Sequence, residues 1–202
     1  MTSDKNTKNA GARERILARV RANRPRSVEH PDVPVFPIAG DRVQNFINHV
    51  KGFDGEVVTV SSRDEAIEWL RQNVAQSDEA PVYSAVDGYQ GNITLEKMPR
   101  PADAHVLQSC VGEGLLGIGE TGSVLVDADT FGRMANGLFA INLYLLLDRT
   151  KIVDGLQHAY AQMNLAEIQY SSLFSGPSAT ADIEAVHITG AQGPVSLTVL
   201  LY

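Results

Sequence analysis

Hydroxyl and carboxyl side chains crowd into one ten-residue stretch near the end of the chain, SGPSATADIE (175–184). Ser178 and Thr180 can hydrogen-bond the backbone that follows the Gly-Pro turn. Asp182 and Glu184 fall on one face if the segment is extended, but about 200° apart if it is helical. One acid in a turn is usually a cap, whereas two acids with three hydroxyls indicate the wall of a polar site.

A second polar group, Glu120-Thr121-Gly122, lies between a glycine-rich turn and a hydrophobic segment. A carboxylate at the edge of a strand can accept hydrogen bonds from backbone N–H groups and so fix a loop. Alternatively, Glu120 faces a ligand in the crevice where α/β sheets bind small molecules. The residues alone leave both interpretations open.

The glycine-rich turn GEGLLG (112–117) fits the pattern G-x-G-x-x-G. A dinucleotide site also needs a helix directly after the glycines, and here GETGSVLVD predicts a turn and a strand. The pattern therefore argues against dinucleotide binding. Its glycines still allow tight turns whose exposed N–H groups a small anion can approach.

Metal and nucleophilic serine chemistry find no support in the residue spacing. No two of the five histidines lie at metal-ligand spacing, and no G-x-S-x-G elbow occurs. Cys110 is the single cysteine, so it cannot alone hold zinc or an iron–sulfur cluster. The sequence predicts no metal site and no redox cofactor in this chain, with Cys110 as a small core residue.

Helices and strands alternate through most of the chain and must position these groups. The apolar run FAINLYLLL (139–147) favours a parallel sheet that helices cover. We therefore expect an α/β fold with a mainly parallel, doubly wound sheet and helices on both faces. Five helices are predicted. They are residues 11–22, a helix that Asp41 caps, a helix that the Ser62–Glu65 pattern opens, residues 130–137, and a helix that Asp148 or Thr150 caps and that includes Ile152 and Val153. Predicted strands are 56–60, 81–85, 105–111, 122–127, 139–147, 185–189 and 195–202, the last two as a terminal hairpin.

The charge distribution separates a basic N-terminal part, 1–39, from a single α/β domain, 40–202. Residues 1–26 hold eight basic and two acidic residues, net +6; the whole chain carries −7, so the remainder carries −13. A helix over 11–22 and a proline-rich crossing segment are expected in this arm, which either stays solvated or docks on an acidic surface. The acidic balance argues against nucleic acid as a partner.

The N-terminal sequence MTSDKNTKNA is polar and lacks the apolar stretch of a signal peptide. The longest apolar run has nine residues, whereas a membrane span needs about 20. We therefore expect a soluble, cytoplasmic protein without a membrane span.

Three blocks resemble, in order and spacing, the signature of the lactate-utilisation protein C family, the LUD domain: ETGSVLVD (120–127), SGPSATADIE (175–184) and GAQGPVSLTVLL (190–201). The resemblance covers roughly residues 40–202. It implies a fold similar to that of sugar-phosphate isomerases and CoA-transferases. It also implies a role in oxidising L-lactate to pyruvate beside a further redox subunit and an iron–sulfur partner, which alone carries the clusters.

Our hypothesis for the site is that three glycine-bearing bends, those of the ETG, SGPS and GAQGP blocks, fold together and form one crevice for a ligand. We expect Glu120 and Asp182 to approach one cavity, and the candidate catalytic groups are Glu120, Asp182 and Glu184. The candidate ligand-binding residues are Gly119, Glu120, Thr121, Gly122, Ser175, Gly176, Pro177, Ser178, Thr180, Asp182, Gly190, Gln192 and Gly193.

Two positions within the motif blocks depart from the family pattern, and LYLLLDR (143–149) replaces an LPPxH-like stretch of the family. The family usually has Arg within SGPSRTADIE, where this chain has Ala179, and often His within GVHGP, where it has Gln192. If that Arg and His bind a small anionic ligand in relatives, this chain has lost two such groups. The departures indicate a divergent member with another ligand or with a scaffolding role.

Glu113 supports a different comparison. GEGLLGIG resembles the ENGxxGxG loop of CoA-transferases, in which the glutamate forms a CoA thioester, although Gly114 replaces the Asn. Three functions therefore stay open. They are an accessory or ligand-binding subunit for lactate oxidation, an acyl-CoA transferase or hydrolase that uses Glu113, and a non-catalytic interaction module that docks through helix 11–22.

Overall fold

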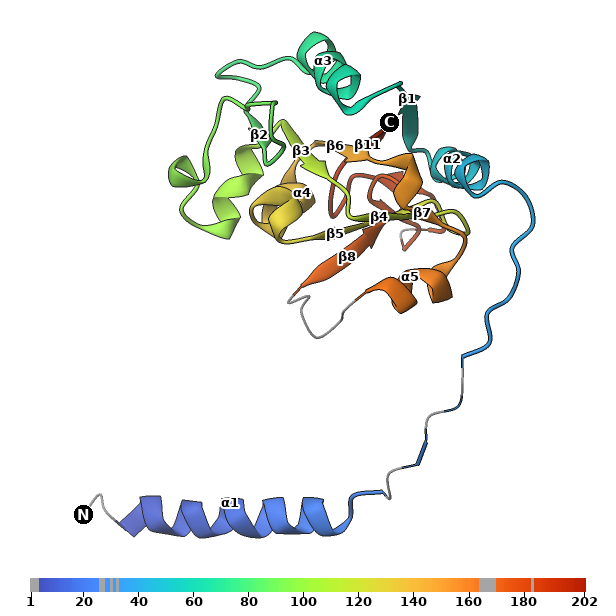
Figure 1. The fold of residues 1–202 in the computed structure, drawn as a ribbon. Coiled ribbons are helices and arrows are strands. Elements are labelled where there is room, and N and C mark those ends of the chain that lie inside the picture. The colour runs from blue at the N-terminus through green and yellow to red at the C-terminus, as the bar shows by residue number, and fades with distance from the viewer. Residues whose placement is uncertain (1–3, 26–27, 30, 32, 164–169, 183) are drawn as a thin grey trace. The chain divides into compact units, whose positions relative to one another are not determined.

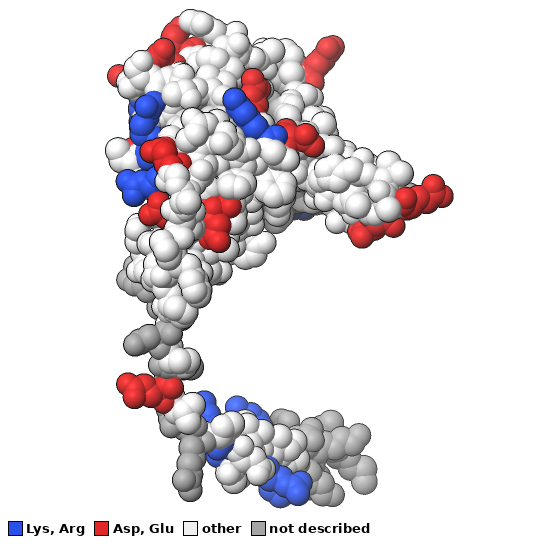
Figure 2. All heavy atoms as spheres, turned by 90° about the vertical axis from the view of Figure 1, so that its right-hand side faces the viewer, with Lys and Arg blue, Asp and Glu red and all other residues white. Residues whose placement is uncertain are grey.

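The computed structural model describes residues 4–25, 28–29, 31, 33–163, 170–182 and 184–202 (Figure 1). Its contacts divide the chain into two compact units, Met1–Pro34 and Val35–Tyr202. The first unit contains the helix α1 (Asp4–Ala22), which begins before the predicted residue 11. Ile16 and Val20 lie one turn apart on α1 and are 62% and 59% exposed. Figure 2 shows basic side chains along α1, and more acidic than basic side chains on the face of the second unit that is in view.

A parallel five-stranded sheet forms the centre of the second unit, in the order β1-β11-β6-β3-β2. Leu143 and Leu145 to Leu147 are fully buried in the central strand, because both faces of the sheet are covered. The predicted α/β class with a mostly parallel sheet is confirmed. The strands are β1 (Glu56–Thr59), β2 (Val82–Ser84), β3 (Ser109–Glu113), β6 (Asn142–Leu147) and β11 (Ser196–Leu201).

The helix α3 (Arg63–Asn73) covers one face of this sheet. Its Ile67 and Leu70 belong to the same apolar cluster as Leu146 and Leu200 of the sheet. Ser62 caps the helix as predicted, because the Glu65 N–H donates to Ser62 Oγ at 3.2 Å. The second half of the predicted capping box is shifted by one residue: the Glu65 carboxylate accepts from the Ser61 N–H at 2.7 Å rather than from the N–H of Ser62.

A second sheet has four strands in the order β7-β4-β5-β8, with both parallel and antiparallel pairs. Together with helices, this sheet covers the other face of the five-stranded sheet, where we expected helices alone. Val124 and Phe174 of this sheet join the core that contains Phe46 and Leu145. Its opposite face packs against the helix α5. The elements of this layer are α2 (Arg42–Gly52), β4 (Leu116–Ile118), β5 (Ser123–Asp127), α4 (Met134–Phe139), β7 (Ile152–Val153), α5 (Leu156–Gln162) and β8 (Ser171–Phe174).

Two sequence-based assignments are wrong. Ile152 and Val153 form β7 rather than the start of a helix, because Ile152 pairs beside Gly117 in the second sheet. The two last strands form no hairpin: β10 (Ile188–Thr189) pairs with β9 (Ala179–Thr180), and β11 lies between β1 and β6. The near-continuous burial of β11 requires cover on both faces, which the centre of the sheet supplies and a hairpin edge does not.

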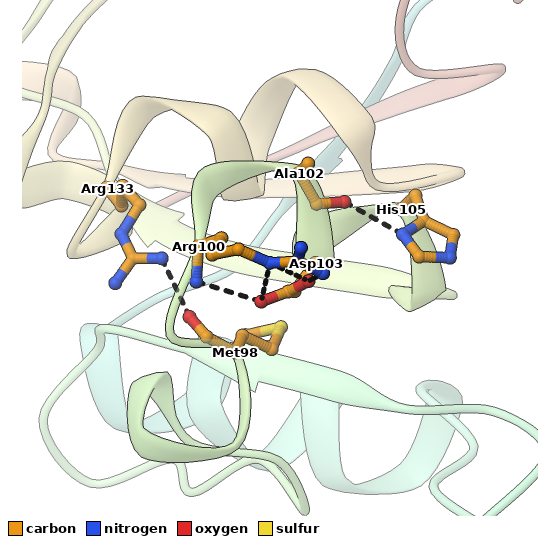
Figure 3. Close-up of polar contacts among 6 residues, drawn as sticks. All are labelled: Met98, Arg100, Ala102, Asp103, His105 and Arg133. Atoms are coloured by element: carbon orange, nitrogen blue, oxygen red, sulfur yellow. Dashed lines mark hydrogen bonds and ion pairs between the residues drawn. The ribbon is translucent and has the colours of Figure 1, made fainter.

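The irregular segment before β3 contains two short 3-10 helices, Leu95–Lys97 and Pro101–Val106, so the predicted strand over 105–111 begins only at Ser109. Figure 3 shows the polar contacts that hold this segment. Arg133 donates to the Met98 carbonyl at 2.8 Å, and the Arg100 N–H donates to the Asp103 carboxylate at 2.8 Å. Hydrogen bonds from Arg100 lower the pKa of Asp103. These contacts position Met98 in the core, where it is 1% exposed.

Along the part of the chain that the structure describes, no helix combines the length and the apolar composition that crossing a membrane requires.

Candidate ligand-binding pocket

Two of the three predicted bends meet at one open pocket of about 550 Å³ beside the C-terminal end of α2. Residues 52–54, 172–179 and 192–194 form most of its wall, and Leu138 and His187 complete it. Its volume lies within the range of about 300–1,000 Å³ that is typical of small-molecule sites. The pocket therefore has the size and the polar composition of a binding site.

The helix α2 supports both the ETG turn and the SGPS turn. A Cβ atom on Gly176 would lie 2.5 Å from the Phe53 carbonyl oxygen, which leaves room only for glycine. Gly122 has a φ of +63°, and a Cβ there would lie 2.6 Å from the Val50 nitrogen. His49 Nδ1 lies 2.9 Å from the carbonyl oxygen of Gly119. Gly122 and Gly176, which are far apart in the sequence, thus allow their two turns to approach the same helix, α2, closely.

A chain of three hydroxyl groups connects the ETG turn with the wall of the pocket. Thr121 Oγ1 lies 2.7 Å from Ser123 Oγ, which lies 2.6 Å from Ser175 Oγ. Ser123 is 3% exposed, and Ser175 lines the pocket. The register of β5 against β8 pairs Val124 with Phe174, so Ser123 and Ser175 meet one step further along the two strands. Hydrogen bonds between hydroxyl groups therefore connect the ETG turn to the SGPS turn, although Thr121 itself does not line the pocket.

Glu120 does not line the pocket. Its carboxylate is exposed and accepts a hydrogen bond from the Leu156 N–H at 3.0 Å, at the start of α5. The loop-fixing interpretation of Glu120 therefore describes its geometry. A carboxylate can accept hydrogen bonds from the free N–H groups at the start of a helix. Glu120 therefore binds the start of α5 and does not face the pocket.

Asp182 and Glu184 also lie outside the wall of the pocket. Asp182 accepts a hydrogen bond from Thr180 Oγ1 at 2.7 Å, and its own N–H donates back to that oxygen at 3.3 Å. Glu184 is exposed, with a φ of +54°. The expectation that Glu120 and Asp182 share this cavity is not met, because each carboxylate serves its own turn.

The remaining candidates separate into two groups. Gly190 lines a smaller neighbouring hollow of about 300 Å³, which shares Leu138, Gln192 and Gly193 with the main pocket. The predicted residues that line the main pocket are Ser175, Gly176, Pro177, Ser178, Gln192 and Gly193. Those that do not are Gly119, Glu120, Thr121, Gly122, Thr180, Asp182 and Gly190.

Sequence reasoning missed the contribution of the loop after α2. Phe53 and Asp54 line the pocket, and Asp54 has a φ of +61°. A non-glycine residue in the left-handed region is uncommon and marks a constrained turn. The Gly-Phe-Asp-Gly sequence at 52–55 was the available signal for such a turn.

The alternative residue, Glu113, lies at the carboxyl end of β3, on the opposite edge of the sheet from the starts of β6 and β11. Arg63 donates to Glu113 Oε2 from Nη2 at 2.8 Å and from Nε at 3.1 Å, and the Tyr202 hydroxyl donates to Oε1 at 2.8 Å. Burial opposes ionisation, but hydrogen bonds from Arg63 and Tyr202 outweigh it and lower the pKa of Glu113. Burial, together with the hydrogen bond to Glu113, raises the pKa of Tyr202 to about 12. Glu113 is thus an ionised carboxylate with both oxygens engaged.

Cys110 is fully buried in β3, and this burial raises the pKa of its thiol far above the ordinary value. A thiol that stays protonated and inaccessible is a poor nucleophile and a poor metal ligand. Within the described ranges, no three His, Cys, Asp or Glu side chains come together in a group that could hold a metal ion.

Comparisons with known proteins agree with this architecture. The part from β3 to the end of the chain, residues 110–202, matches the family model of the LUD domain and includes all three motif blocks. The predicted relationship to LUD-domain proteins is thereby confirmed over these residues. No curated protein matched the chain.

A solved structure, that of a DUF162 family protein from Deinococcus radiodurans, is similar to this chain. The TM-score is 0.56 at 16% sequence identity, and the match covers 79% of this chain and 95% of that chain. At this identity, the similarity establishes a shared fold.

Proposed function

We propose that this LUD-domain protein is a cytoplasmic accessory, ligand-binding subunit that supports the oxidation of L-lactate to pyruvate beside an iron–sulfur partner and a further redox subunit. The observation that carries the proposal is that the SGPS and GAQGP blocks of a LUD-type sequence form one pocket at the end of α2. The ETG block supports the same pocket through the hydroxyl chain and through α2.

The residues of this chain favour an accessory role. Its single cysteine is buried, so iron–sulfur clusters are assigned to the partner.

Lactate carries a carboxylate, which proteins commonly bind with Arg or Lys. The described wall of the pocket contains neither residue. Ala179 and Gln192, the two departures within the motif blocks, both line the pocket, which supports a ligand different from that of relatives.

Reconstitution with the purified iron–sulfur and redox subunits tests this function. The rate of lactate-dependent reduction of an electron acceptor is measured with and without this chain. We expect the rate to fall to background when the chain is omitted. An equal rate in both mixtures would show that the chain has no part in lactate oxidation.

Acyl transfer through Glu113 is a second candidate, because Glu113 lies at the carboxyl ends of parallel strands, where α/β proteins bind ligands. In that reaction the Glu113 carboxylate attacks the acyl carbonyl of an acyl-CoA and expels the CoA thiolate, which leaves a mixed anhydride. The thiolate then attacks the glutamyl carbonyl of this anhydride, so that the acyl group departs as a free carboxylate and the glutamyl thioester forms. Hydroxylamine would convert that thioester into a hydroxamate and leave a mass change on Glu113. Unchanged turnover of acyl-CoA by Glu113→Gln would remove this candidate.

A further inference from the structure

We infer that the pocket beside α2 accepts a small ligand that carries a protonated amine, rather than a free carboxylate or phosphate. The inference rests on the proposed function, because it names the ligand class of the same pocket. Its basis is the charge of the wall, the partial charge of the helix end, and the arrangement of polar and apolar side chains around the cavity.

The side chains of the wall carry a negative charge. Among its described residues, Asp54 is the single acid, and neither Lys nor Arg is present. Asp54 is exposed, and the described ion pairs do not include it. His187 is the other titratable residue of the wall. A cation in the cavity therefore meets the Asp54 carboxylate, whereas the described wall offers an anion neither Lys nor Arg.

The end of α2 adds to this polarity. Carbonyl groups at the C-terminus of a helix carry a partial negative charge, which favours cations. Gly52 is the last residue of α2 and the first residue of the wall. Lys51 in the last turn offsets part of this charge, but it does not line the cavity. The His49 ring does not line the cavity either and contacts the carbonyl of Gly119.

The rest of the wall suits an amine with a short apolar body. Ser172, Ser175 and Ser178 present hydroxyl groups that can accept a hydrogen bond from an ammonium group. Phe53 and Leu138 supply apolar surface beside these hydroxyls. A cavity of about 550 Å³ also leaves much of its space empty around a molecule as small as lactate.

Three probes with the same phenyl-alkyl body test the inference on the full chain: phenethylamine, phenethyl alcohol and hydrocinnamate. Amide chemical shifts of the nitrogen-labelled protein are followed by NMR at pH 8 during titration to millimolar concentrations. We expect phenethylamine to bind about threefold or more tightly than the alcohol, as for one exposed charge pair. Hydrocinnamate should bind weakest, and the shifts should centre on residues 52–54 and 175–178.

Two variants isolate the charge. Asp54→Asn removes the carboxylate while Asn still tolerates a φ of +61°. It should weaken phenethylamine binding about threefold and leave phenethyl alcohol unchanged. Gln192→Glu adds a carboxylate of nearly the same shape to an exposed position of the wall and should strengthen phenethylamine binding.

Any one of three results would overturn the inference. These are hydrocinnamate binding in this pocket as tightly as phenethylamine, an equal loss for all three probes in Asp54→Asn, and no shift at the pocket with any probe. Reconstituted lactate oxidation separates the two claims. If the chain is required there but phenethylamine is not preferred, the ligand class fails and the proposed function stands. If phenethylamine is preferred but the chain is dispensable, the proposed function fails.

Discussion

The hydroxyl of Ser123 links the ETG turn to the wall of the pocket. It is buried and lies within hydrogen-bond distance of the hydroxyls of both Thr121 and Ser175. Removing it leaves two polar groups without their partner, and a lost buried hydrogen bond costs about 1 kcal/mol of stability. The residue therefore holds Ser175 in place, although it does not line the pocket.

Ser123→Ala should lower the free energy of unfolding by about 1 kcal/mol, measured by urea denaturation with Trp69 fluorescence. Thr94→Ala is the control, because Thr94 is exposed and its side chain makes no capping hydrogen bond. Equal stabilities of the two variants would show that the hydroxyl chain contributes nothing.

Tyr202 makes stability depend on alkaline pH. Its pKa is about 12 in the folded chain, against an ordinary value of 10.0. The folded state holds this proton more tightly, so the contribution to stability is complete below pH 10 and is lost as pH rises towards 12. Tyr202→Phe should flatten the alkaline decline of the melting temperature, and the exposed Tyr160→Phe should not. Identical pH profiles would contradict this account.

Glu113 makes the stability of the fold depend on pH in the acidic range, where stability falls as pH falls. Its pKa lies below the ordinary value of 4.5, so its stabilising effect is present above pH 4.5 and is lost as pH falls through the folded pKa. The pair with Arg63 is about one-third exposed on each side, so we expect Glu113→Gln to cost about 1 kcal/mol at pH 7. Thermal unfolding between acid and neutral pH measures this, and an unchanged acid dependence would be inconsistent with the ion pair.

At the scale of elements, α2 supports the motif turns. Local chemistry made α2 and α3 predictable, since Asp41 and Ser62 cap them through neighbours three residues away. Strand pairing was less predictable because it is not local. The three residues of β4 lie inside a glycine-rich turn, and β11 finds its partners in β1 and β6 rather than in the strand just before it.

The same contrast holds for the pocket. SGPS and Gln192 could be identified from the sequence because hydroxyl, glycine and proline residues cluster there. Phe53 and Asp54 could not, since their place in the wall depends on how α2 docks between β1 and the second sheet. Glu120 was misplaced because a sequence does not show which free N–H groups lie nearby, and those of α5 come from 36 residues further along.

Gly176→Ala tests the contact between α2 and the SGPS turn. The added Cβ would lie 2.5 Å from the Phe53 carbonyl oxygen, so the turn must shift. Overpacking of this kind costs about 1–3 kcal/mol, measured as the free energy of unfolding. Gly52→Ala is the matched control, because a Cβ there meets nothing within 4 Å. If both variants lose the same stability, the close approach of Gly176 is not a constraint.

At the scale of the whole molecule, the chain consists of two compact units. The second unit, Val35–Tyr202, has its own core and contains the pocket. The first unit contains α1, whose exposed Ile16 and Val20 are accompanied by arginines. A basic helix of this kind can dock on an acidic surface.

A chain that begins at Val35 should keep the melting temperature of the second unit and lose capture of the iron–sulfur partner. The reason is that the second unit keeps its core, whereas the basic helix is gone. Pull-down of the purified partner by the two forms measures this effect. Equal capture by both forms would remove α1 from the account.

The central claim is that the LUD motifs build a pocket on which function in lactate oxidation depends. Ser178→Trp would fill that pocket, whereas Gln90→Trp places the same side chain at an exposed position outside it. The decisive measurement is the rate of lactate-dependent acceptor reduction in the reconstituted system with each folded variant. We predict that Ser178→Trp lowers the rate at least about tenfold, a change of about 1.4 kcal/mol, and that Gln90→Trp leaves it unchanged. Full activity of a folded Ser178→Trp variant would contradict the account.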